Sequence, residues 1–103
     1  MNADIPLQVW LEASASPPPA IITPYVRSAT DTRLRYRIDA FREDQNGRAT
    51  LRQSGQTMVP AGQATALGHL QLSRTPNDHC EIVVWLLASN ATPVEMRFAC
   101  PDG

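Results

Sequence analysis

The sequence predicts an all-β protein, a seven-stranded antiparallel immunoglobulin-like β-sandwich in which residues 1–103 form a single domain. Three observations support this fold class. Apolar and polar residues alternate with period two along several segments, as they do in half-buried strands. Nine prolines and several turn signals separate these segments at the short spacing typical of sandwiches. No segment of useful length shows helical periodicity, and no apolar run approaches the roughly 18 residues that a membrane helix needs.

Residues 33–41 are the most clearly patterned strand, because apolar residues on one face alternate with arginines on the other. The dipeptide Asn46-Gly47 follows and is a strong hairpin signal, so residues 48–52 are expected to return as the neighbouring strand. Parity adds two side chains of the return strand to the buried face, Ala49 and Leu51. The exposed face of the hairpin then gathers five arginines: Arg33, Arg35, Arg37, Arg48 and Arg52.

Two strands are predicted before this hairpin. Residues 7–12 alternate and read as a first strand. Residues 13–20 contain three consecutive prolines, which predict an extended polyproline-like connector. Residues 21–28 read as a second strand, in which Pro24 indicates an edge position or a bulge. The side chains of the first strand that we expect to face inward are Leu7, Val9 and Leu11.

Three strands are predicted after the hairpin. A turn at residues 60–62 precedes a strand at residues 65–73, and a second turn at residues 75–78 follows it. Residues 79–88 are apolar on both faces, a pattern typical of a central strand. Residues 93–100 alternate again. The inward side chains of these last strands include Leu70, Leu72, Val94, Met96 and Phe98.

The charges of the chain are unevenly distributed. Residues 27–52 hold seven arginines and four acids, a balance of +3, whereas the remaining residues balance to −4 and the whole chain to −1. The chain contains no lysine. The planar guanidinium group suits contact with carboxylates, carbonyls and aromatic rings, so the arginine cluster favours a binding surface. The alternative is a solvated strand face without a partner. Asp39 shares this face and is expected to neutralise one neighbour across the strands.

The two cysteines, Cys80 and Cys100, stand at opposite ends of the predicted final hairpin. A ladder in which Ala88 faces Pro93 places them opposite each other or within one residue, at a separation that a disulfide accepts. Such a disulfide would stabilise the fold by about 3 kcal/mol. Two buried free thiols are the alternative. A disulfide implies an oxidising compartment, and since no signal peptide begins this sequence, we expect a periplasmic protein whose signal peptide has been removed.

Several functional classes are disfavoured. The isolated cysteines, with only His69 and His79 to assist them, do not have the spacing of a zinc site. No nucleophile elbow, catalytic triad pattern, glycine-rich phosphate loop or carboxylate pair is present, so we expect no enzyme, cofactor or metal. The stacking aromatics and high isoelectric point of a nucleic-acid-binding sheet are missing, and nothing indicates a membrane partner.

Four segments carry a family resemblance: residues 35–43, 59–63, 67–72 and 78–84. On these segments the chain resembles the CsgC/CsgH family of periplasmic curli amyloid inhibitors, most of all its CsgH branch, over roughly residues 27–100. The family resemblance implies a small seven-stranded sandwich that keeps curli subunits from forming amyloid before export. Some members have a Cys-X-Cys motif, but Thr32 and Leu34 stand at the matching positions, so a thiol-exchange role is not expected.

The resemblance implies an amyloidogenic curli subunit as partner, and the residues suggest how it is held. We expect a monomer that attracts the unfolded or early oligomeric subunit electrostatically and makes weak, exchanging contacts that divert nucleation. The alternative is a generic extracytoplasmic binding or adhesion module that pairs with its client through an edge strand. The predicted client-binding residues are Arg33, Arg35, Arg37, Arg48 and Arg52, flanked by Arg27 and Arg42.

Overall fold

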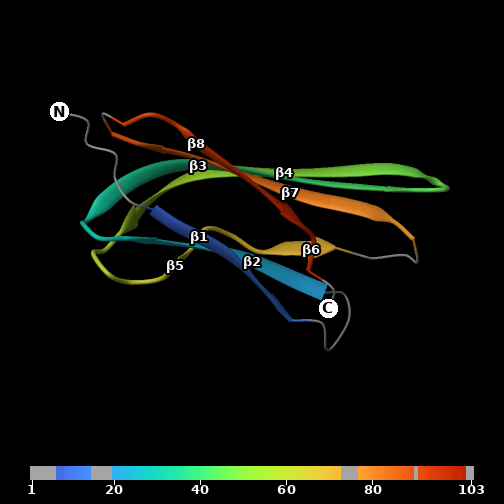
Figure 1. The fold of residues 1–103 in the computed structure, drawn as a ribbon, viewed down its shortest axis with the longest axis horizontal. Helices are drawn as coiled ribbons and strands as arrows, with labels where there is room; N and C mark the ends of the chain where they lie inside the picture. The colour runs from blue at the N-terminus through green and yellow to red at the C-terminus, as the bar shows by residue number, and fades with distance from the viewer. Residues whose placement is uncertain (1–6, 15–19, 73–76, 90, 102–103) are drawn as a thin grey trace.

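The computed structural model describes residues 7–14, 20–72, 77–89 and 91–101. These residues form two antiparallel sheets that face each other in a sandwich-like arrangement (Figure 1). The all-β prediction is confirmed, and no helix in the described ranges is long and apolar enough to cross a membrane. The three prolines at residues 17–19 and the start of the predicted turn at residues 75–78 lie outside the described residues.

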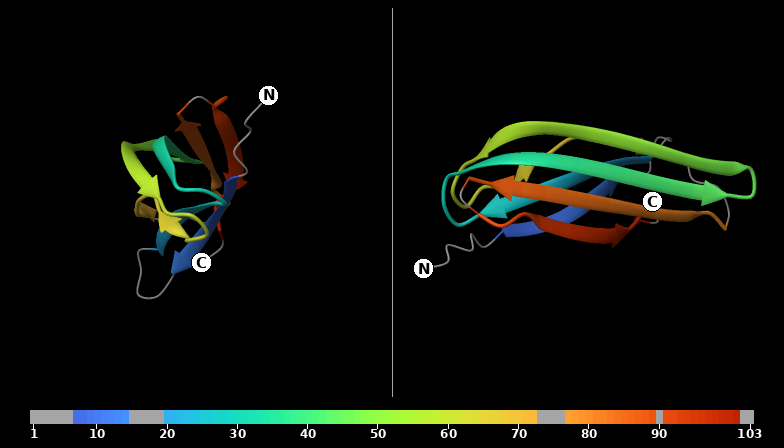
Figure 2. Two further views of the ribbon diagram at one scale, coloured as in Figure 1. Left: turned by 90° about the vertical axis from the view of Figure 1, so that its left-hand side faces the viewer. Right: turned by 90° about the horizontal axis from the view of Figure 1, so that it is seen from above.

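Each sheet contains four strands. In the first sheet β2 (Ala20–Ser28) pairs with β1 (Leu7–Ser14) on one side and with β5 (Thr65–Ala66) and β6 (Leu70–Leu72) on the other. The second sheet has the order β4-β3-β7-β8, seen from above in the right panel of Figure 2. Its strands are β3 (Thr32–Asp44), β4 (Gly47–Val59), β7 (His79–Ala88) and β8 (Val94–Ala99).

The described residues contain eight strands instead of the predicted seven. The predicted strand at residues 65–73 is two short strands, β5 and β6, which pair with different parts of β2. Between them Leu67 turns inward and is buried, and its N–H donates to the carbonyl of Pro24 at 2.9 Å. The inserted residues break the ladder, so one predicted strand becomes two.

The prediction that Pro24 marks an edge is wrong, because β2 pairs with β1 on one side and with β5 and β6 on the other. The alternative of a bulge agrees with the register, because residues 23–24 of β2 stand opposite residues 67–69, one more residue on the partner side. In a strand the N–H and C=O of one residue point to the same side. The carbonyl of Pro24 points toward Leu67, so its missing N–H faces the gap between β5 and β6. A proline is tolerated there because no ladder hydrogen bond is lost.

The β3–β4 hairpin forms where it was predicted. Asp44 pairs with Gly47, which leaves Gln45 and Asn46 as the two turn residues. The Asp44 carboxylate accepts a hydrogen bond from the Asn46 N–H at 2.8 Å, an Asx turn that fixes the reversal. Gly47 has a φ of 134°, a backbone angle that residues other than glycine rarely adopt. The ladder then runs without a bulge to the pair Thr32 and Val59.

The prediction that Ala49 and Leu51 are buried is wrong. Both lie on the inner side of β4 as parity requires, but both are exposed, Leu51 to 39%. The reason is that the hairpin tip extends past the ends of β2 and β6, so the first sheet does not cover it (Figure 1). The alternation of apolar and polar residues therefore predicted correctly which side of β4 these side chains lie on, but not how far the first sheet extends over them.

The core fills the space between the sheets. Leu7, Val9 and Leu11 pack against it from β1, as predicted, and the central position of β7 is also confirmed. The most deeply buried side chains come from β2, β3, β4, β6 and β7 and are mainly branched aliphatics, which suit a pleated, two-layer core. They include Ile22, Val26, Leu34, Ile38, Val59, Leu70, Ile82, Val84 and Leu86.

Cys80 and Cys100 form a disulfide, as the sequence predicted, with their Cα atoms 5.4 Å apart. The Cys100 N–H also donates to the Cys80 carbonyl at 3.2 Å, so backbone and side chains both close the β7–β8 hairpin. Both cysteines are buried. The disulfide fits a non-cytoplasmic location.

Candidate functional site

The outer surface of the second sheet carries most of the arginines of the chain. We call this surface the arginine face and define it by the outward side chains of β3 and β4, with those of β7 and β8 beside them. The register places Asp39 opposite Arg52 and Glu43 opposite Arg48, so β3 and β4 contribute to one surface. The arginines that the two strands bring together there are Arg33, Arg35, Arg37, Arg48 and Arg52.

A buried acid lies in the middle of the arginine face. One carboxylate oxygen of Asp39 accepts a hydrogen bond from Nε of Arg52 at 2.7 Å, and the other lies 3.4 Å from Nε of Arg37. The Asp39 side chain is only 7% exposed, whereas both arginine side chains are largely in solvent. Asp39 therefore neutralises two guanidinium groups in part, and not one as the sequence indicated.

Arg33 and Arg35 are different, because neither has a carboxylate within ion-pair distance among the described residues. Both are exposed and help to line a shallow pocket of about 280 Å³ on this face. Its other walls combine the amide of Gln56 with the apolar side chain of Leu87. This end of the face offers uncompensated positive charge beside an apolar surface, a combination suited to an acidic segment that also carries apolar residues.

Three further arginines of the face, Arg37, Arg48 and Arg97, each contact an acidic or aromatic side chain. Arg48 lies 3.2 Å from Glu43 in a solvent-exposed pair of little energetic weight. The guanidinium of Arg37 also lies 5.9 Å from the ring centroid of Trp85 on β7, a cation–π contact. On β8, the hydrogen bond that Arg97 donates to Glu81 at 2.9 Å raises the pKa of Arg97, and the charge of that carboxylate adds to the effect.

Two of the predicted flanking residues lie elsewhere. Arg27 projects from β2 in the other sheet, where its guanidinium lies 5.6 Å from the ring centroid of Trp10. Trp10 in turn stacks on Tyr25. Arg42 has the inward parity of β3, is only partly exposed, and donates a hydrogen bond to Asp44 at 3.0 Å. The prediction that Arg27 and Arg42 flank the arginine face is therefore wrong.

Sequence reasoning missed three residues of this surface. Gln56 and Leu87 lie on either side of Arg35, on β4 and β7, and Arg97 lies across β7. The hairpin register could have identified Gln56, because every paired position of β3 and β4 follows from the Asp44–Gly47 closure. Leu87 and Arg97 depend on the order β3-β7-β8, which no local pattern reveals.

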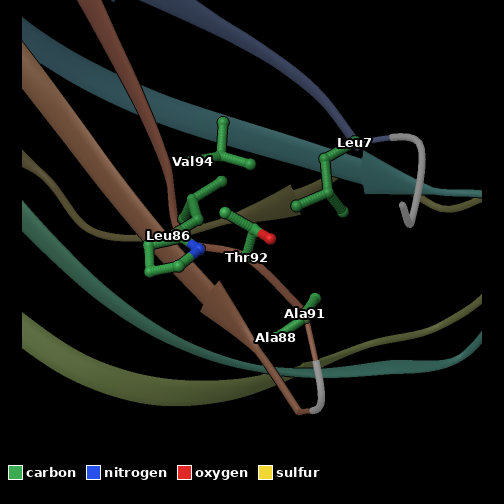
Figure 3. Close-up of a pocket in the computed structure, with 7 residues that line it drawn as sticks. Leu7, Leu86, Ala88, Ala91, Thr92 and Val94 are labelled. Carbon is green, nitrogen blue, oxygen red and sulfur yellow. The ribbon is translucent and has the colours of Figure 1, made fainter. Parts of the chain in front are cut away.

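A second pocket, of about 290 Å³, lies where β1 and β8 approach the loop after β7 (Figure 3). Its walls are almost entirely apolar, with Leu7 on one side and Leu86 and Val94 on the other. It contains no charged group, and in the described ranges no group of three or more potential metal ligands comes together anywhere. The arginine face is therefore the stronger candidate for function.

Two facing antiparallel sheets, a disulfide and a cationic outer strand face define a small disulfide-bonded β-sandwich. More specifically, the chain belongs to the Tafi-CsgC family, the thin aggregative fimbriae synthesis proteins, whose profile matches residues 1–93. The predicted resemblance to the CsgC/CsgH family is thus confirmed for the family as a whole, but not for its CsgH branch. Membership supports a curli-related role, and the family is associated with curli assembly and is not a known enzyme family.

Solved structures agree with this assignment. The chain is similar to the E. coli curli protein CsgC, with a TM-score of 0.78 and 24% identity over 90% of this chain and 98% of that one. It is also similar to R. palustris CsgH, with a TM-score of 0.74 and 14% identity over 90% of this chain and 91% of that one. These likenesses concern the fold. A comparison with curated protein sequences found no match.

Proposed function

We propose that this protein is a periplasmic, chaperone-like inhibitor that keeps an amyloidogenic curli subunit from assembling into fibrils. Membership of the Tafi-CsgC family supports the curli component as partner. The arginine face supplies the contact surface. The protein acts as a monomer, without catalysis or cofactor, on the unfolded or early oligomeric subunit.

The observation that carries this proposal is the pair Arg33 and Arg35. β3 is a central strand, paired with β4 on one side and β7 on the other, and the side chains of Arg33 and Arg35 point outward from it. Neither arginine has an acidic partner among the residues described. A structural role would place a carboxylate beside them, as Asp39 stands beside Arg37. Two exposed, uncompensated guanidinium groups on a rigid strand instead favour contact with another chain.

The expected mode of action is kinetic. Each exposed charge contact contributes about 0.2–1 kcal/mol, so a single encounter is weak and short-lived. The summed positive field accelerates the encounter with an acidic chain, however, and weak contacts suffice to interrupt a rare nucleation event. The protein is therefore expected to lengthen the lag phase at substoichiometric amounts instead of sequestering all of the monomer.

The test is a dye-binding fibrillation assay with a curli subunit and the double variant Arg33→Gln/Arg35→Gln. The variant should lose most of the lag extension, because it removes the uncompensated charge and leaves the pairs around Asp39 in place. The matched control is Arg27→Gln/Arg42→Gln, which removes the same charge from the other sheet and from the inward side of β3. Equal loss in both variants would mean that net charge, and not the arginine face, determines inhibition.

Two further outcomes decide against the proposal. If the Arg33→Gln/Arg35→Gln variant is folded, by its far-ultraviolet circular dichroism, and still extends the lag phase as the wild type does, the arginine face is not the contact surface. If the wild type itself leaves the lag phase unchanged, the inhibitory function is wrong. A generic adhesion module would give this second result.

A further inference from the structure

The free edge of β4 is the longest unpaired strand edge in the part of the chain that the structure describes. Among the described residues, β4 pairs only with β3, over 13 residues and without a bulge. The other exposed edges are shorter: β1 has 8 residues, β8 has 6, and β5 and β6 are interrupted. Proteins normally protect long edges with charged side chains, above all lysine, or with proline, bulges or a covering segment. β4 has neither lysine nor proline, and the charged residues along its edge are Arg48 and Arg52.

The direction of the β4 amides follows from the ladder. The carbonyl of Cys80 accepts a hydrogen bond from the N–H of Cys100. In β7 the backbone groups of the even-numbered residues therefore point to β8, and those of the odd-numbered residues point to β3. Their partners on β3 are the outward-facing residues such as Arg35 and Arg37. The inward-facing residues of β3 consequently bond to β4. The backbone groups of the outward-facing β4 residues therefore point away from the sheet, at Arg48, Thr50, Arg52, Ser54, Gln56 and Met58.

The same residues thus present unpaired backbone at the edge and side chains on the arginine face. All six are exposed. The hydrogen bond that Gln53 donates to the carbonyl of His69 at 2.9 Å comes from the inward-facing side of β4. The edge is therefore open along the arginine face. A strand added there would align its own side chains beside Arg48 and Arg52 on one face and beside exposed Leu51 on the other.

We propose that the β4 edge binds an extended polypeptide segment as an added strand, and that this segment alternates acidic with apolar residues. Carboxylates on one face of the added strand would meet Arg48 and Arg52, and apolar side chains on its other face would cover Leu51 at the overhanging hairpin tip. A second copy of this chain is disfavoured as occupant, because two β4 edges would bring like charges together. The inference deepens the proposed function and rests on it for the origin of the segment.

The direct test uses a capped peptide of about ten residues that alternates glutamate and valine, long enough to pair with most of the edge. The readout is amide hydrogen exchange of the wild-type protein, resolved by residue. The amides of Thr50, Arg52 and Gln56 should exchange quickly in the free protein and become protected with the peptide, whereas the amides already bonded to β3 should change little. A peptide of the same composition with its glutamates in one block should give no such alternating protection. Absence of protection with the alternating peptide would overturn the proposal.

A variant provides the second test. Ser54→Pro removes one outward N–H and leaves the β3–β4 ladder and every arginine intact, and proline is accepted at such an edge position. Affinity for the alternating peptide should fall about tenfold, which corresponds to the loss of one hydrogen bond and its immediate neighbours. The matched control is Ala99→Pro, which places proline at an outward-pointing amide of the other edge, on β8. This control should bind as the wild type does, and equal loss in both variants would contradict the proposal.

The two proposals fail in different ways. If Ser54→Pro extends the fibrillation lag phase of a curli subunit fully while Arg33→Gln/Arg35→Gln does not, the edge is not used and the arginine face remains the contact surface. If the wild type has no effect on fibrillation, the proposed function is wrong, and the exchange experiment with the peptide still decides whether β4 accepts a strand. Protection of β4 amides on raising the protein concentration alone would identify a second copy as the occupant and overturn the acidic-segment proposal.

Discussion

Arg52 donates a hydrogen bond from Nε to Oδ1 of Asp39 at 2.7 Å across the β3–β4 ladder. The second oxygen of the same carboxylate lies 3.4 Å from Nε of Arg37, so one buried acid holds two arginines from neighbouring strands. This arrangement keeps the hairpin stable although it carries five arginines on one face. It also divides the face into a compensated centre and an uncompensated end at Arg33 and Arg35.

Replacement of the central acid should therefore separate stability from binding. Asp39→Asn keeps the shape of the side chain but removes the charge that holds Arg37 and Arg52, so the free energy of unfolding should fall by about 1–2 kcal/mol. Denaturant unfolding measures this loss. The same variant should associate faster with an acidic client, because two more guanidinium groups are released.

The control for this variant is Glu95→Gln, which makes the same charge change at the exposed edge of the sheet, 3.8 Å from Arg97. It should leave stability within about 0.5 kcal/mol of the wild type, as exposed substitutions usually do. If Asp39→Asn were no less stable than Glu95→Gln, the buried pairs would have no structural role.

Inhibition should weaken as the salt concentration rises. The uncompensated groups, Arg33 and Arg35, are exposed, and the Debye length shortens from about 30 Å at 0.01 M to about 3 Å at 1 M salt. Association rates measured by stopped flow across this range should therefore fall steeply for the wild type and only slightly for Arg33→Gln/Arg35→Gln. A wild-type rate independent of salt would argue for apolar recognition, for example through Leu87.

Much of this surface could be predicted from local pattern. Alternation assigned the outward residues of β3 and β4 correctly, and the Asn46-Gly47 signal located the reversal that brings Arg52 opposite Asp39. The pairing of Cys80 with Cys100 followed from the length of the final hairpin in the same way. Each of these features depends on contacts within one hairpin, where parity and loop length determine the register.

The failures all concern relations between elements that are distant in the sequence. Leu51 has the inward parity, but its exposure depends on where the other sheet ends. Pro24 lies in a central strand and not at an edge, and its place opposite the break between β5 and β6 depends on how these two distant strands pair. Arg27 is near the arginine strand in sequence, but the chain crosses to the other sheet between them. A single sequence has no local signal for any of these long-range facts.

The disulfide should make a large contribution to stability. It closes a loop between residues 20 positions apart, and the chain-entropy relation gives about 3 kcal/mol for a loop of this length. The double variant Cys80→Ala/Cys100→Ala should therefore unfold at a lower denaturant concentration, with a somewhat steeper transition because the unfolded chain without the cross-link exposes more surface. Chemical reduction of the wild type should produce the same shift. If reduction left the midpoint unchanged, the fold would be supported by its core alone.

The pair Tyr36 and Gly55 gives a prediction about the middle of the hairpin. They lie opposite each other on β3 and β4, and the Tyr36 ring covers Gly55 so closely that an added Cβ would be 2.7 Å from the phenolic oxygen and 3.0 Å from Cζ. Gly55→Ala should thus cost about 1–3 kcal/mol of unfolding free energy, because the partly buried ring must move.

A double-mutant cycle tests the origin of this cost. Tyr36→Phe removes the phenolic oxygen, the atom nearest to the added Cβ, so Gly55→Ala should be less destabilising by about 1 kcal/mol in the Tyr36→Phe background than in the wild type. Denaturant unfolding of the four proteins measures this coupling. Ser54→Ala, at the neighbouring exposed position of the same strand, is the control and should be nearly neutral. Strict additivity between positions 36 and 55 would show that the loss of glycine acts through the unfolded chain and not through contact with the ring.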